Sequence, residues 1–176
     1  MTSFGKIAVL DIETTGLLQS DRTALIGVME AGAVRQYLSH DFKDVRVTCD
    51  TLLSYNGRRF DLPFLERALP DYAAQIQFER HVDLMESARQ FLCNDGKPVT
   101  AQTHFISKDQ ACRMMGIYVP KDPAGSGFRC ALIGRRMLSP ELPPDDFEVS
   151  EVALHNATDL YATLALFKVF LHEGWV

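Results

Sequence analysis

The stretch KIAVLDIETTG, residues 6–16, joins an apolar run to a pair of carboxylates. The apolar part predicts a buried central strand, and Asp11 and Glu13 come where that strand ends. Residues two apart in a strand point to the same side, so we expect both carboxylates to project together while Ile12 faces the opposite layer. Paired acids repel each other unless a cation lies between them, and oxygen ligands suit Mg²⁺ or Mn²⁺. The alternative is a solvated strand end that caps the following turn, Thr14-Thr15-Gly16.

The composition is that of an ordinary globular protein, because 47% of the 176 residues are hydrophobic and 23% are charged. The length predicts one domain that spans residues 1–176. No apolar run is long enough to cross a membrane, and the N-terminal residues lack the pattern of a signal peptide. The four cysteines are scattered without C-x-x-C spacing. This spacing argues against a zinc site and a disulfide framework, and favours reduced thiols in a cytoplasmic protein.

The net charge of -5 argues against indiscriminate nucleic-acid binding, but the charge is unevenly distributed along the chain. The segment from Lys97 to Arg136 contains seven Lys or Arg and two Asp, whereas the rest contains eleven Lys or Arg and 21 acids. The segment is therefore a candidate basic face for a nucleic acid, with solvated helix surface as the alternative.

The pattern of apolar runs and breaks predicts five strands, with helices dominating the second half of the chain. Strands are expected at residues 5–11, 24–30, 32–38, 51–56 and 78–84. Helices are expected at residues 61–69, 85–92, 107–117, 128–138 and 147–172, and loops at 93–103 and 120–127. This order predicts an α/β fold in which a mixed central sheet is flanked by helices. The outline resembles a ribonuclease-H-like fold, which the order alone does not single out.

Two further motifs add polar groups that can reach a shared site. Asp61 heads the helix that follows the turn at Asn56, where an N-cap role is the simpler interpretation of the acid alone. His155 and Asp159 are four residues apart in the last helix and therefore share one helical face, with an exposed surface pair as the alternative. Asn156 points about 100° away from His155 on the same helix, so we do not assign it to the site.

Taken together, the motifs resemble those of the DEDD superfamily of 3′-to-5′ exonucleases. They are a D-x-E pattern in DIETTG, an N-x-x-x-F/Y-D pattern at Asn56, Phe60 and Asp61, and an H/Y-x-x-x-D pattern at His155 and Asp159. Within this superfamily the chain is most similar to YprB-type ribonuclease-H-like domains and to the proofreading domains of family B DNA polymerases. One branch of the superfamily places a histidine five residues before the last aspartate, where this chain has Leu154. The other branch places a tyrosine four residues before it, where this chain has His155.

The resemblance implies a metal-dependent 3′-to-5′ exonuclease that hydrolyses phosphodiester bonds of DNA or RNA with two metal ions. The implied ligands of two Mg²⁺ or Mn²⁺ ions are Asp11, Glu13, Asp61 and Asp159. His155 is the implied general base, which takes a proton from the attacking water. Contacts with the terminal nucleotides are implied for Thr14, Thr15, Asn56 and Phe60.

Three other interpretations remain open at this point. The chain is an endonuclease that cuts structured nucleic acid, a binding or assembly module without turnover, or a component of a larger nucleic-acid-processing assembly. Asp83 is a further acid at a strand end, and we expect a supporting or structural role for it because the set of four acids is already complete.

Overall fold

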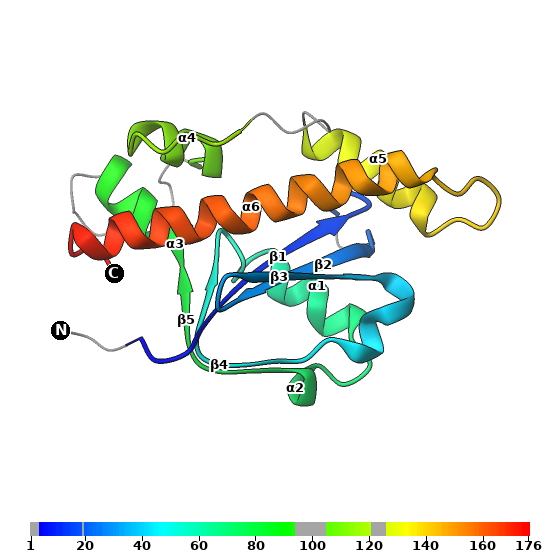
Figure 1. The fold of residues 1–176 in the computed structure, drawn as a ribbon, viewed down its shortest axis with the longest axis horizontal. Helices are drawn as coiled ribbons and strands as arrows, with labels where there is room; N and C mark the ends of the chain where they lie inside the picture. Colours follow the sequence, from blue (N-terminus) through cyan, green and yellow to red (C-terminus); the bar gives the residue numbers. More distant parts are fainter. Residues whose placement is uncertain (1–3, 19, 94–104, 121–125) are drawn as a thin grey trace.

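A mixed sheet of five strands lies between two layers of helices in the computed structural model, which describes residues 4–18, 20–93, 105–120 and 126–176 (Figure 1). The strands are β1 (Ile7–Thr14), β2 (Thr23–Glu30), β3 (Ala33–Leu38), β4 (Val47–Ser54) and β5 (Ile76–Asp83). Their order in the sheet is β3-β2-β1-β4-β5. β4 runs parallel to both β1 and β5, whereas β2 runs antiparallel to both β1 and β3. The predicted α/β fold with a mixed, helix-flanked sheet is therefore confirmed.

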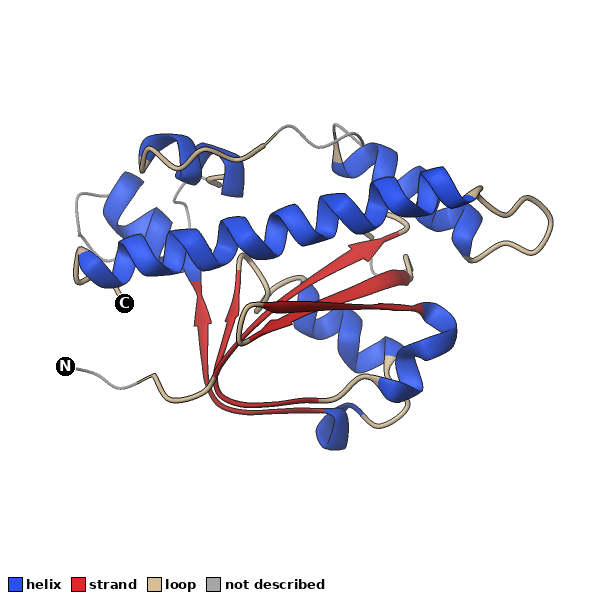
Figure 2. Ribbon diagram, in the orientation of Figure 1, coloured by secondary structure: helices blue, strands red, loops and turns tan. Residues whose placement is uncertain are grey.

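The helices divide between the two faces of this sheet (Figure 2). One face is covered by α3 (Leu84–Ala88), α4 (Lys108–Met114), α5 (Gly127–Met137) and the long α6 (Asp146–His172), and a π-helical turn, η2 (Arg89–Cys93), continues α3. The opposite face is covered by the 3-10 helix η1 (Ser39–Asp44), α1 (Asp61–Ala68) and α2 (Tyr72–Gln75). These are the α6 face and the α1 face of the sheet.

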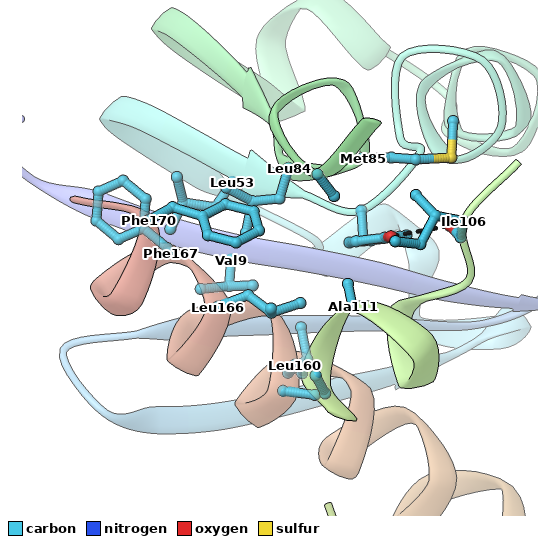
Figure 3. Close-up of a cluster of buried hydrophobic side chains, with 14 of the residues drawn as sticks. Val9, Leu53, Leu84, Met85, Ile106, Ala111, Leu160, Leu166, Phe167 and Phe170 are labelled. Atoms are coloured by element: carbon cyan, nitrogen blue, oxygen red, sulfur yellow. Dashed lines mark hydrogen bonds between the residues drawn. The ribbon is translucent and has the colours of Figure 1, made fainter. Parts of the chain in front are cut away.

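β1 lies at the centre of the sheet and is apolar on both faces because both are covered. Val9 packs on the α6 face, in one buried cluster with Leu160, Leu166 and Phe170 of α6 (Figure 3). Alternate residues of the same strand pack on the α1 face with α1 and η1. The strand therefore presents every second side chain to α6, and this sets the direction of the two acids that follow Val9.

Two strands are longer than the sequence predicts. β1 continues to Thr14, because β2 pairs with it as far as Thr14↔Thr23. Both acids therefore lie within the paired strand, and Glu13 lies two residues beyond the end predicted at residue 11. β4 begins at Val47, four residues before the predicted start, because its first half alternates buried and exposed side chains and pairs with β5.

The predicted helices agree closely with the structure, whereas the short elements were missed. The prediction of a last helix over residues 147–172 is confirmed by α6, whose start is fixed by a capping box between Asp145 and Glu148. β2 and β3 are joined by a tight turn with positive φ angles at Ala31 and Gly32. Neither η1 nor α2 was predicted. Most of the loops predicted at residues 93–103 and 120–127 lie outside the described residues.

In the part of the chain that the structure describes, no helix has the length and apolar character needed to cross a membrane.

Candidate metal centre

Asp11 and Glu13 both point to the α6 face, as the strand alternation predicts. They continue the row that Val9 begins, while Ile12 between them is buried among the residues of the α1 face. The side chain of Asp11 is 13% exposed and Glu13 is 7% exposed. The chain therefore buries two carboxylates on one side of its central strand, which is costly unless opposite charge compensates for them.

Asp61 reaches the same region from the start of α1. Its Oδ1 accepts a hydrogen bond from the backbone N–H of Ile12 at 3.1 Å, and the residue is 4% exposed. Asp61 is the first residue of the helix and makes no N-cap hydrogen bond, because the N-cap position belongs to Phe60. The N-cap interpretation is therefore wrong, and the carboxylate is directed at β1 instead.

The turn that carries Asp61 is held by Asp83 at the end of β5. Its two carboxylate oxygens accept hydrogen bonds from the backbone N–H groups of Asn56 at 2.7 Å and Arg58 at 3.0 Å. Asn56 itself has a φ of 67°, a conformation that asparagine tolerates better than most residues. Asp83 thus has the supporting role expected for it, because it fixes the backbone that aims Asp61.

Asp159 reaches the centre from α6, and a lysine that the motifs do not include lies between it and Asp11. The Nζ of Lys108 is 3.0 Å from Oδ1 of Asp11 and 2.8 Å from Oδ2 of Asp159. Lys108 is the first residue of α4, and its side chain is only 12% exposed. Its sequence neighbours predict only the start of a helix, yet Lys108 is the cation that bridges two of the four acids.

The electrostatics of the centre follow from this crowding. Burial raises the pKa of Glu13 and of Asp61 well above the usual range, and the charge of Asp11 raises both further. Burial also raises the pKa of Asp11, although Lys108 opposes this shift. Burial would lower the pKa of Lys108, but the carboxylates of Asp11 and Asp159 outweigh it, so this pKa lies above its ordinary value. The centre carries more negative charge than one ammonium group neutralises.

Asn156, which the sequence argument left out, holds Asp11 in place. Its Nδ2 donates to Oδ2 of Asp11 at 2.9 Å, and its Oδ1 accepts from Nε2 of Gln36 at 3.1 Å. Gln36, Gly27 and Asp11 are register partners across β3, β2 and β1. Asn156 is fully buried over Gly27, where a Cβ would overlap its side-chain oxygen. The missing side chain at Gly27 is therefore what admits Asn156 to the sheet.

The donor set fits a divalent cation in type, but not without movement of Lys108. Four carboxylates from β1, α1 and α6 supply the oxygen ligands that Mg²⁺ and Mn²⁺ prefer. No three of these acids have ligand atoms that all lie within 4.8 Å of one another. The ammonium group of Lys108 lies in the gap between Asp11 and Asp159. An ion shared by these two acids would have to replace it.

His155 lies one helical turn before Asp159, on the same side of α6. Both residues line a cavity of about 530 Å³ whose other walls come from α4, residues 117–120 and the start of α5. Arg113 of α4 lines the same cavity. Solvent or a ligand can therefore reach His155 and Asp159 from this side.

The four residues with implied substrate contacts have internal roles. The hydroxyl of Thr14 donates to the carbonyl of Gly16 at 2.6 Å, and Thr15 Oγ1 donates to Asp21 at 3.1 Å. Phe60 packs against the Phe64 ring, with the centroids 4.8 Å apart. Asn56, as described above, forms the turn before α1. Contacts of these residues with a nucleotide stay a prediction.

A family model for the RNase H superfamily matches residues 8–105, which is just over half of the chain and all of the sheet except its first residue, Ile7. The chain belongs to the RNase H superfamily. No curated protein sequence matches it.

Solved structures with the same fold include three relevant cases, all at low sequence identity. A structure of exonuclease I has a TM-score of 0.55 and 15% identity over 94% of this chain and 40% of that chain. The EXO domain of Aedes aegypti Nibbler has a TM-score of 0.53 and 14% identity, covering 94% of this chain and 79% of that chain. A zinc-bound complex of E. coli exonuclease I with single-stranded DNA has a TM-score of 0.50 and 16% identity, over 97% and 41%. The chain thus spans about 40% of the length of exonuclease I. At this level of identity, the structural similarity shows a shared fold.

Proposed function

We propose that this protein is a divalent-metal-dependent nuclease that removes nucleotides from the 3′ end of DNA or RNA. The observation that carries the proposal is the convergence of Asp11, Glu13, Asp61 and Asp159 from three separate elements at the end of the central strand. Burying four acids together destabilises a fold, so a cluster of this kind indicates a site kept for its chemistry.

The four acids would hold Mg²⁺ or Mn²⁺, two ions in the arrangement that the resemblance implies. Bound ions of this kind lower the pKa of a water molecule and stabilise the charge that develops on the phosphate and on the leaving oxygen. The protein's own contribution is to position the ligands: Ile12 N–H fixes Asp61, and Asn156 fixes Asp11. Lys108 supplies the compensating charge while no ion is bound.

His155 is the residue proposed to accept a proton from the attacking water. It lines the cavity beside Asp159, and an imidazole at this place faces the solvent side of the acid cluster. Nucleic acid would enter along the same cavity, where Arg113 supplies positive charge. The proposed contacts of Thr14, Thr15, Asn56 and Phe60 with the terminal nucleotide belong to this hypothesis.

The decisive experiment is a time course on end-labelled DNA and RNA oligonucleotides with Mg²⁺ or Mn²⁺. A ladder that shortens from the 3′ end would support the exonuclease, and the sugar preference would be read from the same gel. Asp11→Asn and Asp159→Asn should each reduce hydrolysis by at least about 100-fold, because each removes a charged ligand of the centre. Asp44→Ala, which changes an exposed acid of η1, should retain the wild-type rate. Full activity of either Asn variant would contradict the assignment.

Two alternatives have distinct experimental outcomes. Cleavage of circular substrates, or of substrates blocked by a 3′-phosphate, would indicate an endonuclease. A binding module without turnover is favoured by one observation, the position of Lys108 between Asp11 and Asp159. In that case, calorimetry would detect no Mn²⁺ binding to the wild-type protein.

A further inference from the structure

Beside the four acids, three side chains of a different chemical type converge from three elements. They are Glu13 of β1, Cys130 of α5 and His155 of α6, and one ligand atom of each lies within 4.8 Å of the others. Within the described part of the chain, this is the one group of three His, Cys, Asp or Glu side chains with such spacing. Cys130 is fully buried, and Glu13 is nearly so.

The close approach of α5 to β1 accounts for the position of Cys130. Gly134, one turn after Cys130 on the same helical face, lies so close to the strand that an added Cβ would be 3.3 Å from the carbonyl oxygen of Thr14. Arg135 also donates to the carbonyl of Thr15 at 2.8 Å. These contacts fix α5 against the end of β1, and the thiol is thereby directed toward Glu13. Packing alone accounts for a buried cysteine, but not for the carboxylate and the imidazole beside it.

The spacing of the group suits a zinc ion. Zinc bonds of about 2.0–2.3 Å place tetrahedral ligands roughly 3.3–3.8 Å apart. The three ligand atoms lie no more than 4.8 Å from one another, so they need to close by at most about 1.5 Å. A thiolate and an imidazole select a softer ion than Mg²⁺ or Mn²⁺, which distinguishes this group from the four acids. His155 borders the cavity of about 530 Å³, so a water molecule can complete a fourth position.

We propose that Glu13, Cys130 and His155 form a second metal site, selective for Zn²⁺ or a similar borderline-soft divalent cation. Binding replaces the proton of the Cys130 thiol with the metal and releases that proton to solvent. When zinc is bound, Glu13 no longer serves as a ligand of the four-acid centre, and His155 cannot act as the general base. Zinc bound there therefore inhibits hydrolysis, a consequence that rests on the proposed function, whereas zinc binding itself does not.

The binding test uses Co²⁺ as a spectroscopic probe on the full chain. Co²⁺ should give a thiolate charge-transfer band with the wild-type protein, and Zn²⁺ should displace it while Mg²⁺ should not. Cys130→Ala should lose the band, and His155→Gln should weaken Co²⁺ affinity at least about 10-fold. The matched controls Cys49→Ala and Cys112→Ala change buried thiols of β4 and α4 and should keep the band. The proposal is overturned if the wild-type protein gives no thiolate band, or if Cys130→Ala keeps it.

Thermal unfolding of each variant without metal verifies that loss of the band does not reflect loss of the fold. If Cys130→Ala does not fold, the half-buried His155→Gln variant decides, because unchanged Co²⁺ affinity in it would overturn the site. In the hydrolysis assay with Mn²⁺, the Zn²⁺ concentration that inhibits the wild-type protein should be at least about 10-fold lower than the concentration that inhibits Cys130→Ala. A thiolate band without any hydrolysis would contradict the proposed nuclease alone, whereas hydrolysis without a band would contradict the zinc site alone.

Discussion

At the scale of single residues, the stability of the metal-free centre depends on Lys108. Its ammonium group contacts Asp11 and Asp159, and no more than a quarter of any of the three side chains is exposed. Lys108→Met keeps the apolar stem and removes the charge, so the acids lose their partner. We expect the free energy of unfolding in EDTA to fall by about 3 kcal/mol, because breaking a buried ion pair leaves charge uncompensated. Chemical denaturation measures this change.

A divalent ion should replace the lost charge in this variant. Mn²⁺ should therefore raise the Tm of Lys108→Met more than that of the wild-type protein, in which the ion must displace the lysine. Lys168→Met changes an exposed lysine of α6 and should leave both quantities unchanged. Equal stabilisation of Lys108→Met and wild type by Mn²⁺ would refute the role of Lys108 as a placeholder.

The sequence reveals the acids of this centre but not their lysine. Asp11 and Glu13 are linked by strand periodicity, and the convergence of Asp61 with them was found from a spaced motif. Lys108 is 97 residues from Asp11 and belongs to no such pattern, since its sequence neighbours predict only the start of a helix. Its role depends on where α4 packs, and a local pattern carries no information about that position.

At the scale of elements, α6 crosses β2 at Gly27, and the fit depends on a missing side chain. Gly27→Ala should destabilise the protein by about 2 kcal/mol, because the new Cβ overlaps Asn156 in a region without free space. Asn156→Ala should also destabilise it, since the hydrogen bonds to Asp11 and Gln36 are lost. The loss of unfolding free energy in the double variant should be at least about 1 kcal/mol smaller than the sum of the losses in the two single variants, because alanine at position 156 relieves the overlap with the new Cβ.

Unfolding free energies of the four proteins in this cycle measure the coupling. Gly127→Ala is the matched control, because a Cβ at the first residue of α5 meets no atom within 4 Å. It should change stability by less than about 0.5 kcal/mol. Strict additivity of Gly27→Ala and Asn156→Ala would mean that the two residues do not share this contact in solution.

The interaction between α6 and the sheet also explains why Asn156 escaped the sequence argument. A difference of about 100° in direction around a helix excludes the adjacent residue from a site only when all other groups of that site lie on one side of the helix. Here α6 lies across several strands, so His155 faces Glu13 and Cys130 while Asn156 faces Gly27 and Gln36. Adjacent residues of one helix thus contact different parts of the same centre.

At the scale of the whole molecule, periodicity predicts the elements and the layer architecture but not the order of the strands. Val9 and Ile12 predict two covered faces because apolar residues continue on both sides of β1. The sequence does not predict that β4 lies next to β1 and that β5 pairs with β4 in parallel. The parallel pairing of β4 and β5 depends on how α1 and α2 connect the two strands across the α1 face. The short α2 and η1 have too few residues for a helical period to be visible.

The buried acids also make the stability of the whole molecule depend on pH. Because the pKa values of Glu13 and Asp61 are raised in the folded state, the folded protein keeps protons that the unfolded chain has already lost. The free energy of unfolding of the metal-free protein therefore decreases as the pH rises from the ordinary carboxyl pKa toward the raised values. This loss is the reverse of the behaviour of a salt-bridged acid, whose pKa is depressed.

Glu13→Gln isolates this contribution, since it removes one titrating group and retains its shape. In EDTA, the variant should unfold close to the wild-type temperature at about pH 5 and several degrees above it at about pH 8. One unit of pKa corresponds to about 1.4 kcal/mol, and each kcal/mol to about 2–4 °C in a chain of this length. Differential scanning calorimetry across this range measures the difference, with Glu79→Gln on the exposed side of β5 as the control. If the Tm difference between Glu13→Gln and wild type is the same at both pH values, the pKa of Glu13 is not raised in the folded protein, and its ionised form does not destabilise the fold.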